Sequence, residues 1–318
     1  MKVEVASKIA VIADEVRADY KRGRCIDRME DVFNQPDREI IFACLRNLLK
    51  VLYPGYYRDK NFKIYNLDNT IAVLLEDILF HLSKQVYIAL RNAKTNPFEG
   101  KEELHEFAVE ATLDFLATIP EVRSYLEDDL KAAFEGDPAA FNYSEIIISY
   151  PGLFAISIYR LAHELYELNV PLIPRVMTEY AHSRTGIDIH PGARIGRHFF
   201  IDHGTGIVIG QSTIIGDHVK IYQGVTLGAL STHGGQSLSN QKRHPTIEDN
   251  VTIYSNASIL GGQTVIGHDS VIGGNAFVTH SVKPGTRVSV STQELKLTDI
   301  RRDSGAKDPQ DECWYYII

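Results

Sequence analysis

The stretch DIHPGARIGRHFFIDHGTGIVIG, residues 188–210, decides the fold because it carries an isoleucine at every sixth position. The six-residue spacing continues beyond it, with small shifts, and resumes after an interruption at residues 228–244. The aliphatic positions are Ile189, Ile195, Ile201, Ile207, Ile209, Ile215, Ile221, Leu227, Ile247, Ile253, Ile259, Ile266, Ile272 and Val278. A helix has no period of six and a half-buried sheet has a period of two. The spacing therefore predicts a parallel β-helix of short strands, each with one aliphatic side chain pointing inward.

Small residues accompany the aliphatic positions of this repeat. Glycine follows six of them, as Gly196, Gly210, Gly216, Gly228, Gly267 and Gly273. Residues that sit two positions before an aliphatic are Ala193, Thr205, Thr213, Val225, Ala257, Ser270 and Ala276. We expect the glycines to form the corners, where tight turns favour them. The alternative is an ordinary β-sandwich with accidental spacing, but stacked repeats are the usual meaning of a short fixed period.

The first part of the chain has the apolar spacing of helices. Apolar residues recur three and four apart over residues 38–53, 69–92, 102–119 and 153–168, which is typical of helices with one buried face. We expect Pro171 and Pro174 to break or restart the last of these helices.

The change of period divides the chain into three predicted parts. We predict an α-helical domain over residues 1–182, a β-helix over residues 183–290 with an inserted loop at 228–244, and a tail over residues 291–318. The predicted fold class is therefore α+β and multidomain.

Composition narrows the classes of function. The 318 residues carry a formal net charge of −8, which argues against general binding to nucleic acid or anionic lipid. Cys25, Cys44 and Cys313 are widely spaced and form no CxxC motif, so neither a disulfide framework nor a zinc site is indicated. No run of 18 apolar residues occurs, and we expect a cytoplasmic protein.

The motif DHGTG interrupts the repeat, because Asp202 and His203 lie between Ile201 and Ile207. One interpretation is structural: aspartate tolerates turn geometry, and His203 is a surface residue. The other is functional, since active sites are where local sequence rules tend to break.

Three segments of the chain resemble the serine O-acetyltransferases, a family of the hexapeptide-repeat acyltransferases. They are residues 188–210, VTLGA at 225–229 and KRHPTIEDNV at 242–251, and the likeness spans about residues 130–282. The resemblance implies a left-handed β-helix. The chain departs from the common family pattern in a longer loop at 228–244, in VSVSTQELKL (288–297) where the family usually has GVPA, and in a longer region before Asp137.

The resemblance implies transfer of acetyl from acetyl-CoA to the hydroxyl of L-serine, giving O-acetyl-L-serine and CoA, the first step of cysteine biosynthesis. Removing the hydroxyl proton needs a general base, and histidine suits this role near neutral pH. His203 is the predicted base. Asp188, fifteen residues earlier, could orient it as in the serine hydrolases, and the two match the family's catalytic dyad. We expect a supporting role for His190.

The likeness also implies a serine site with charges of both signs. Arg243 and His244, reached across a subunit boundary, would bind the carboxylate, and a guanidinium suits this group. Asp202 and Asp137 would face the ammonium. The structural alternatives are a solvated basic loop for KRHP and a helix N-cap for Asp137 before Pro138.

Positions matching the family's acetyl-CoA contacts are Ala229, Ser255 and Gly274, and no metal is expected. The resemblance further implies a homotrimer or a dimer of trimers. It favours a tail that binds O-acetylserine sulfhydrylase through Ile318, aided by Trp314 and Tyr316, because C-terminal carboxylates are a known recognition element. The alternative is a final strand packed on its own subunit.

Three other functions remain open at this point. A γ-type carbonic anhydrase uses a similar β-helix but needs three histidines that converge on a metal. A non-catalytic scaffold would leave the matched residues coincidental. Another hexapeptide acetyltransferase, acting on a sugar or on homoserine, is the nearest alternative.

Overall fold

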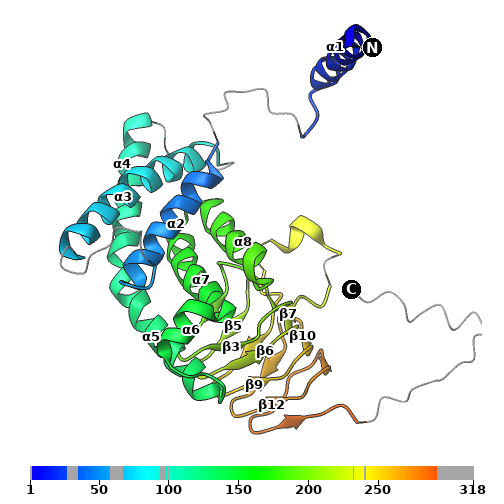
Figure 1. The fold of residues 1–318 in the computed structure, drawn as a ribbon. Helices are drawn as coiled ribbons and strands as arrows, with labels where there is room; N and C mark the ends of the chain where they lie inside the picture. Colours follow the sequence, from blue (N-terminus) through cyan, green and yellow to red (C-terminus); the bar gives the residue numbers. More distant parts are fainter. Residues whose placement is uncertain are drawn as a thin grey trace, which may run out of the picture.

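The computed structural model describes residues 2–26, 35–57, 67–93, 98, 100–231, 233–239 and 241–291. Helices come first and a strand solenoid follows them (Figure 1). The helices are α1 (Lys2–Tyr20), α2 (Arg38–Leu52), α3 (Leu67–Arg91), α4 (Lys101–Ala117), α5 (Ile119–Gly136), α6 (Tyr143–Ser149), α7 (Pro151–Glu167) and α8 (Ile173–Thr185).

The four helices predicted over residues 38–168 form close to their expected bounds, as α2, α3, α4 and α7. The predicted break is also confirmed, because α7 ends at Glu167 and α8 begins at Ile173 with Pro174 in its first turn. A proline is tolerated there because the first turn of a helix has no hydrogen bond to lose. Helix α8 runs to Thr185, three residues past the expected boundary at 182.

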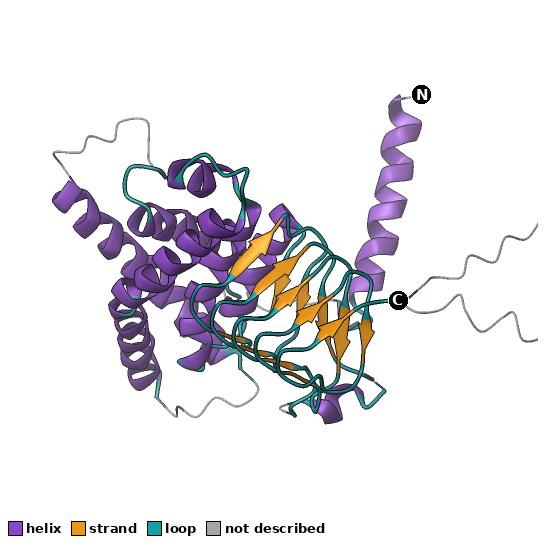
Figure 2. Cartoon of the chain, turned by 90° about the horizontal axis from the view of Figure 1, so that it is seen from below, coloured by secondary structure: helices purple, strands orange, loops and turns teal. Residues whose placement is uncertain are grey.

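The strands wind into a parallel β-helix with three sheets (Figure 2). Sheet A has the order β1-β4-β7-β10-β13, sheet B has β11-β8-β5-β2, and sheet C has β14-β12-β9-β6-β3. The strands are β1 (Asp188–Ile189), β2 (Arg194–Ile195), β3 (Phe200–Asp202), β4 (Val208–Ile209), β5 (Ile214–Ile215), β6 (Lys220–Tyr222), β7 (Thr226–Gly228), β8 (Thr246–Ile247), β9 (Thr252–Ile253), β10 (Ser258–Leu260), β11 (Val265–Ile266), β12 (Val271–Ile272), β13 (Phe277–Val278) and β14 (Arg287–Val288). The predicted left-handed β-helix behind a helical region is the fold of this chain.

The inward positions are those that the six-residue period predicts. Every one of the fourteen aliphatic side chains is at most 8 % exposed. Their register stacks them in columns, for example Ile201 on Ile221 and Ile221 on Ile253. Burial of each such side chain is worth about 1.5–3 kcal/mol, so the columns form the core of the solenoid.

The expected role of the six glycines is wrong. None of them has a positive φ; among non-glycine residues in the solenoid, the left-handed conformation occurs at His198, His203, His218, Asn250, Asn256, Asp269 and Asn275. The glycines are needed for space, since a Cβ on Gly210 would lie 2.0 Å from the His244 ring and one on Gly196 would lie 2.3 Å from an Asp217 oxygen. Close approach between coils, and not turn conformation, selects glycine at these positions.

Two other glycines bring helices onto strand β3. A Cβ on Gly136, at the end of α5, would lie 2.7 Å from the Phe200 ring, and one on Gly152, in the first turn of α7, would lie 2.5 Å from the carbonyl oxygen of Ile201. The ends of both helices can therefore touch β3, the strand whose last residue, Asp202, begins DHGTG. Arg160 of α7 and Asp129 of α5 form a buried ion pair. Arg160 also donates to two backbone carbonyls of the solenoid, so this pair connects both helices to the β-helix.

Among the described residues, no single helix is long and apolar enough to cross a membrane. Helices α6 and α7, bent by 74° at their junction, pass the same test only as a pair. The predicted tail residues Trp314, Tyr316 and Ile318 lie outside the described residues.

Candidate active site

His203 occupies a corner that is longer than the corner of the next coil. Ile201 in sheet C and Ile209 in sheet A are eight residues apart, whereas Ile221 and Leu227 in the next coil are six apart. The corner of His203 therefore contains two more residues than the corner of the next coil. His203 itself is left-handed, with φ of 58°, and its side chain is 72 % exposed.

Asp202 and Asp137 lie beside this histidine, and we call the three residues the acidic corner. The Asp202 side chain is 15 % exposed, and its Oδ1 lies 3.7 Å from Nε2 of His203. Asp137 follows Gly136 and is held close to β3 by the contact of that glycine with Phe200. The hydrogen bond from Tyr150 is the largest cause that lowers the pKa of Asp137, and the charge of His203 adds a smaller contribution.

The environment of Asp137 keeps it ionised. The Tyr150 hydroxyl donates to Asp137 Oδ2 at 2.5 Å, and the backbone N–H of Ala139 donates to Oδ1 at 2.8 Å. The Tyr150 hydrogen bond is the main cause that holds the pKa of Asp137 below its usual value. Asp137 caps the C-terminus of α5, and the N-cap of the next helix is Asn142, so the N-cap interpretation of Asp137 is wrong.

Lys220 closes the acidic corner from strand β6. Its Nζ donates to the carbonyl oxygen of Gly136 at 2.6 Å and lies 3.8 Å from Oδ2 of Asp202. The ammonium also lies 4.8 Å from the ring centres of both Phe200 and Tyr222. Lys220 therefore connects the end of α5 to sheet C and places a cation beside Asp202.

The second group of predicted residues lies at a different corner, where the loop 228–244 leaves β7 in sheet A and returns to β8 in sheet B. We call Lys242, Arg243 and His244 the basic corner. The Arg243 guanidinium donates to the side chain of Gln211 at 2.7 Å and to the carbonyl of Leu238 at 3.2 Å. These contacts hold the guanidinium in one place.

Ser212 organises the basic corner. Its Oγ accepts the backbone N–H groups of Arg243 at 2.9 Å and of His244 at 3.1 Å. The Ser212 N–H donates to Nδ1 of His244 at 3.1 Å, so the proton of the neutral ring is on Nε2. Burial lowers the pKa of His244 to about 4, and the ring is a neutral N–H donor at pH 7.

Lys242 fastens the end of the loop. Its Nζ donates to the carbonyl oxygens of Ser212, His244 and Pro245 at 2.6–3.0 Å, and burial lowers its pKa to about 8. The interpretation of KRHP as a solvated basic loop is therefore wrong. A hollow of about 490 Å³ opens beside Arg243 and is also lined by Tyr166, Glu167, Gly192, Arg194, Gln211, Ser212, Thr213, Ile214, Gln241 and Lys242.

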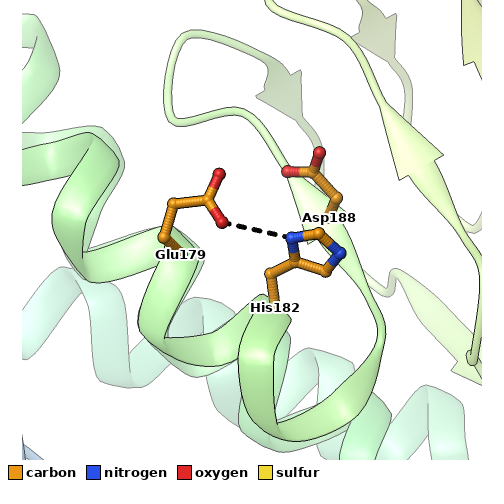
Figure 3. A group of neighbouring side chains, drawn as sticks. All are labelled: Glu179, His182 and Asp188. Carbon is orange, nitrogen blue, oxygen red and sulfur yellow. Dashed lines mark hydrogen bonds and ion pairs between the residues drawn. The ribbon is translucent and has the colours of Figure 1, made fainter.

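Asp188 lies on β1 of sheet A and is held by α8. Its Oδ1 accepts from Arg175 at 3.0 Å, and Arg175 also pairs with Glu179. His182 lies beside both carboxylates and interacts with Glu179 at 3.2 Å (Figure 3). Asp188 and His203 are both described, and no hydrogen bond or ion pair joins them within this copy of the chain.

Glu179, His182 and Asp188 place possible metal-ligand atoms within 4.8 Å of one another. The Arg175 guanidinium already pairs with both carboxylates of this group, and a metal ion would have to displace it. We assign no metal to these residues. His190, two residues after Asp188, accepts from the N–H of Gly192 at 3.0 Å, and burial lowers its pKa to about 4, which fits the expected supporting role of a neutral ring.

The residues matched to acetyl-CoA contacts divide between the two corners. Ser255 and Gly274 lie on the corner column of His203, where a Cβ on Gly274 would be 3.2 Å from the carbonyl oxygen of Ser255 and Asn275 donates to that oxygen at 2.9 Å. Ala229 follows β7 at the start of the loop that carries the basic corner. One copy of the chain therefore presents these residues at both ends of the strands of sheet A.

Comparison with known proteins adds the family to this geometry. No protein-family model matches the chain. A serine acetyltransferase of Synechococcus elongatus, described as plasmid-borne, is 44 % identical over 260 residues, which cover 80 % of this chain and 81 % of that protein. The chain belongs to the serine acetyltransferase family. A second serine acetyltransferase, from Synechocystis, is 50 % identical over 125 residues, 39 % of this chain and 48 % of that protein.

Solved structures of serine acetyltransferases share the architecture. Serine acetyltransferase 1 of Entamoeba histolytica, in complex with L-cysteine, has a TM-score of 0.68 at 34 % identity, covering 82 % of this chain and 93 % of that one. The Neisseria gonorrhoeae serine acetyltransferase in complex with serine has a TM-score of 0.51 at 29 % identity, covering 77 % and 94 %.

The sequence patterns do not identify the residues that hold the predicted site residues of this serine acetyltransferase in place. Tyr150, Lys220, Ser212 and Arg175 each contact a predicted site residue. Nothing in the local sequence separates them from ordinary residues at a helix start, on an outward strand position or at a corner. Only the packing of helices on the solenoid reveals their partners.

Proposed function

We propose that this chain transfers the acetyl group of acetyl-CoA to the hydroxyl of L-serine, giving O-acetyl-L-serine and CoA, the first step of cysteine biosynthesis. The observation that carries the proposal is the acidic corner. It sets an exposed histidine beside two carboxylates in a chain of the serine acetyltransferase family. Membership of this family favours the proposal over a carbonic anhydrase, a scaffold or another acetyltransferase.

The proposed base is His203. Its ring takes the hydroxyl proton as the serine oxygen attacks the thioester carbonyl, and the imidazolium then returns that proton to the departing CoA sulfur. The serine O–C bond forms and the C–S bond breaks, so the step balances without another reactant. Asp188 is the proposed carboxylate that orients His203 and stabilises the imidazolium.

Serine is a zwitterion, and the two corners have the matching charges. Asp137 and Asp202 would hold the ammonium, while Arg243 and the Nε2–H of His244 would hold the carboxylate. His203 lies at the corner before a strand of sheet A, and Arg243 lies in the loop that follows one, so the two corners are at opposite ends of these strands in one copy. We propose that the acidic corner of one copy meets the basic corner of the next, which cyclic symmetry closes into a homotrimer or a dimer of trimers.

The same arrangement suits acetyl-CoA. Ser255 and Gly274 on the column of His203, and Ala229 of the neighbouring copy, would line one groove between two solenoids. Small residues on this path leave backbone amides accessible to the pantetheine arm. The thioester would then end beside His203.

Thiol release from acetyl-CoA tests the proposed function. The purified chain should release CoA thiol with L-serine, and much more slowly with L-homoserine or an amino sugar. Mass spectrometry should identify O-acetyl-L-serine as the product. Preferred turnover of homoserine or of a sugar would contradict the proposal and support the nearest alternative.

We further propose that the tail binds O-acetylserine sulfhydrylase through Ile318, with Trp314 and Tyr316 adding apolar contact. The support is the family and the apolar sequence CWYYII at residues 313–318. Deleting Ile318 should abolish co-purification with the sulfhydrylase and leave acetyltransferase activity unchanged. A truncated chain that still binds would contradict this role. The cytoplasmic location stays a prediction.

A further inference from the structure

Three carboxylates are assigned to the proposed reaction, and they differ in whether a permanent cation lies within 4 Å of them. Asp188 is paired with the Arg175 guanidinium at 3.0 Å, and Asp202 lies 3.8 Å from the Lys220 ammonium. Asp137 instead accepts hydrogen bonds from two neutral donors, the Tyr150 hydroxyl and the N–H of Ala139. A neutral donor orients a carboxylate without cancelling its charge, and Asp137 therefore keeps a full charge for an ammonium ligand.

The structure fixes the Tyr150 hydroxyl firmly. Tyr150 is the N-cap residue of α7, Pro151 follows in the first turn, and Gly152 places this turn against the backbone of Ile201. The backbone that carries Tyr150 is thus packed against β3, the strand that also carries Asp202. Its hydrogen bond to Asp137 raises the pKa of Tyr150 to about 12, and the phenol stays protonated and donating throughout the neutral range.

Acidic groups surround the Tyr150 hydroxyl, and two basic groups lie near Asp137. Asp137, Asp202 and Glu145 all act on Tyr150 electrostatically, whereas Lys220 and His203 act on Asp137. Lys220 gives its hydrogen bond to the carbonyl of Gly136 and not to Asp137. Apart from the Tyr150 hydroxyl, the described hydrogen-bond donor on the Asp137 carboxylate is a backbone N–H, which leaves lone pairs of both oxygens for a ligand.

We infer that Tyr150 is a positioning residue for the substrate ammonium, which it serves by fixing the carboxylate of Asp137; this inference rests on the proposed function. Tyr150 touches no reacting atom. It sets the affinity for the amino group of serine and leaves the acetyl transfer itself to His203.

Steady-state kinetics of Tyr150→Phe test the inference. The KM for serine should rise roughly 10-fold, the effect of losing a hydrogen bond to a charged group, while kcat and the KM for acetyl-CoA change by less than about twofold. Inhibition by 3-hydroxypropanoate, which has the hydroxyl and carboxylate of serine but no ammonium, should not change. Tyr56→Phe is the matched control, because it removes a hydroxyl that contacts Ser144 of α6 and not Asp137.

A double-mutant cycle with Asp137→Asn shows whether Tyr150 acts through Asp137. The double variant should have the serine KM of Asp137→Asn alone, because two groups in one interaction are not additive. Multiplicative effects, or equal losses for serine and 3-hydroxypropanoate, would overturn the role of Tyr150 while leaving the proposed function intact. A wild-type chain that does not turn over serine would overturn the proposed function itself.

Discussion

The acidic and basic corners are built by opposite means on one solenoid. The acidic corner is assembled from outside, because α5 and α7 bring Asp137 and Tyr150 onto β3 through the close approach of Gly136 and Gly152. The basic corner is assembled from within, because the loop 228–244 folds back and fastens itself to Ser212. At the acidic corner the solenoid carries Asp202 and His203 and the end of α5 adds Asp137, whereas at the basic corner the inserted loop carries all three basic residues.

The difference between the two corners shows how a regular β-helix can carry charged groups for a binding site. A coil of small and aliphatic residues has no room for a buried charge, since each inward position belongs to the core. Charged groups are added at corners, where an extra residue or a loop costs little. The acidic and basic corners lie at opposite ends of the strands of sheet A, and the proposed function needs a second copy to bring them together.

The base at the acidic corner should show the largest effect. His203→Ala should lower kcat by about 10²–10⁴-fold, the usual contribution of a general base. His218→Ala is the matched control, because His218 is also a left-handed corner histidine, with φ of 57°, but lies at the corner between sheets B and C. Unchanged turnover in a folded His203→Ala variant, measured by thiol release, would remove His203 from the reaction.

Asp188→Asn tests whether this carboxylate orients the base. It should keep the fold and lower kcat roughly 10²-fold or more, because a wrong tautomer disables a histidine base. Circular dichroism checks the fold, and thiol release gives kcat. Near-normal turnover would confine Asp188 to its ion pair with Arg175.

Arg243→Ala tests the basic corner. The KM for serine should rise roughly 100-fold, because the substrate carboxylate loses a charged, two-pronged partner, while the KM for acetyl-CoA stays nearly constant. Arg194→Ala, which removes another arginine at the same hollow, is the control. Equal losses for both substrates would mean that the loop itself had collapsed.

The junction at the acidic corner should show the smallest effect. Gly152→Ala forces a Cβ to 2.5 Å from the Ile201 carbonyl oxygen and should cost about 1–3 kcal/mol of unfolding free energy in urea. Gly100→Ala is the control, because its Cβ would meet nothing closer than 3.9 Å. Equal stability of the two variants would show that α7 does not depend on this close approach.

The fold could be predicted because its signal is local: fourteen aliphatic side chains mark the inward face without reference to any distant residue. The reason why glycine is required after the aliphatic positions could not be predicted, because the clash at Gly210 involves His244, which is 34 residues away in the sequence. The matched site residues came from resemblance to a family. The role of Tyr150 could not be predicted from the sequence either. Its contact with Asp137 forms only where α5 and α7 meet on β3.

Subunit complementation tests most directly whether the two corners form one site across copies. His203→Ala and Arg243→Ala chains, unfolded together and refolded as a mixture, should recover roughly a quarter of the wild-type kcat/KM for serine, measured at serine far below the wild-type KM and at saturating acetyl-CoA. In a random cyclic assembly, half of the copies offer an intact His203 and half of their neighbours an intact Arg243. A mixture no more active than the average of the two separately refolded variants would contradict the account.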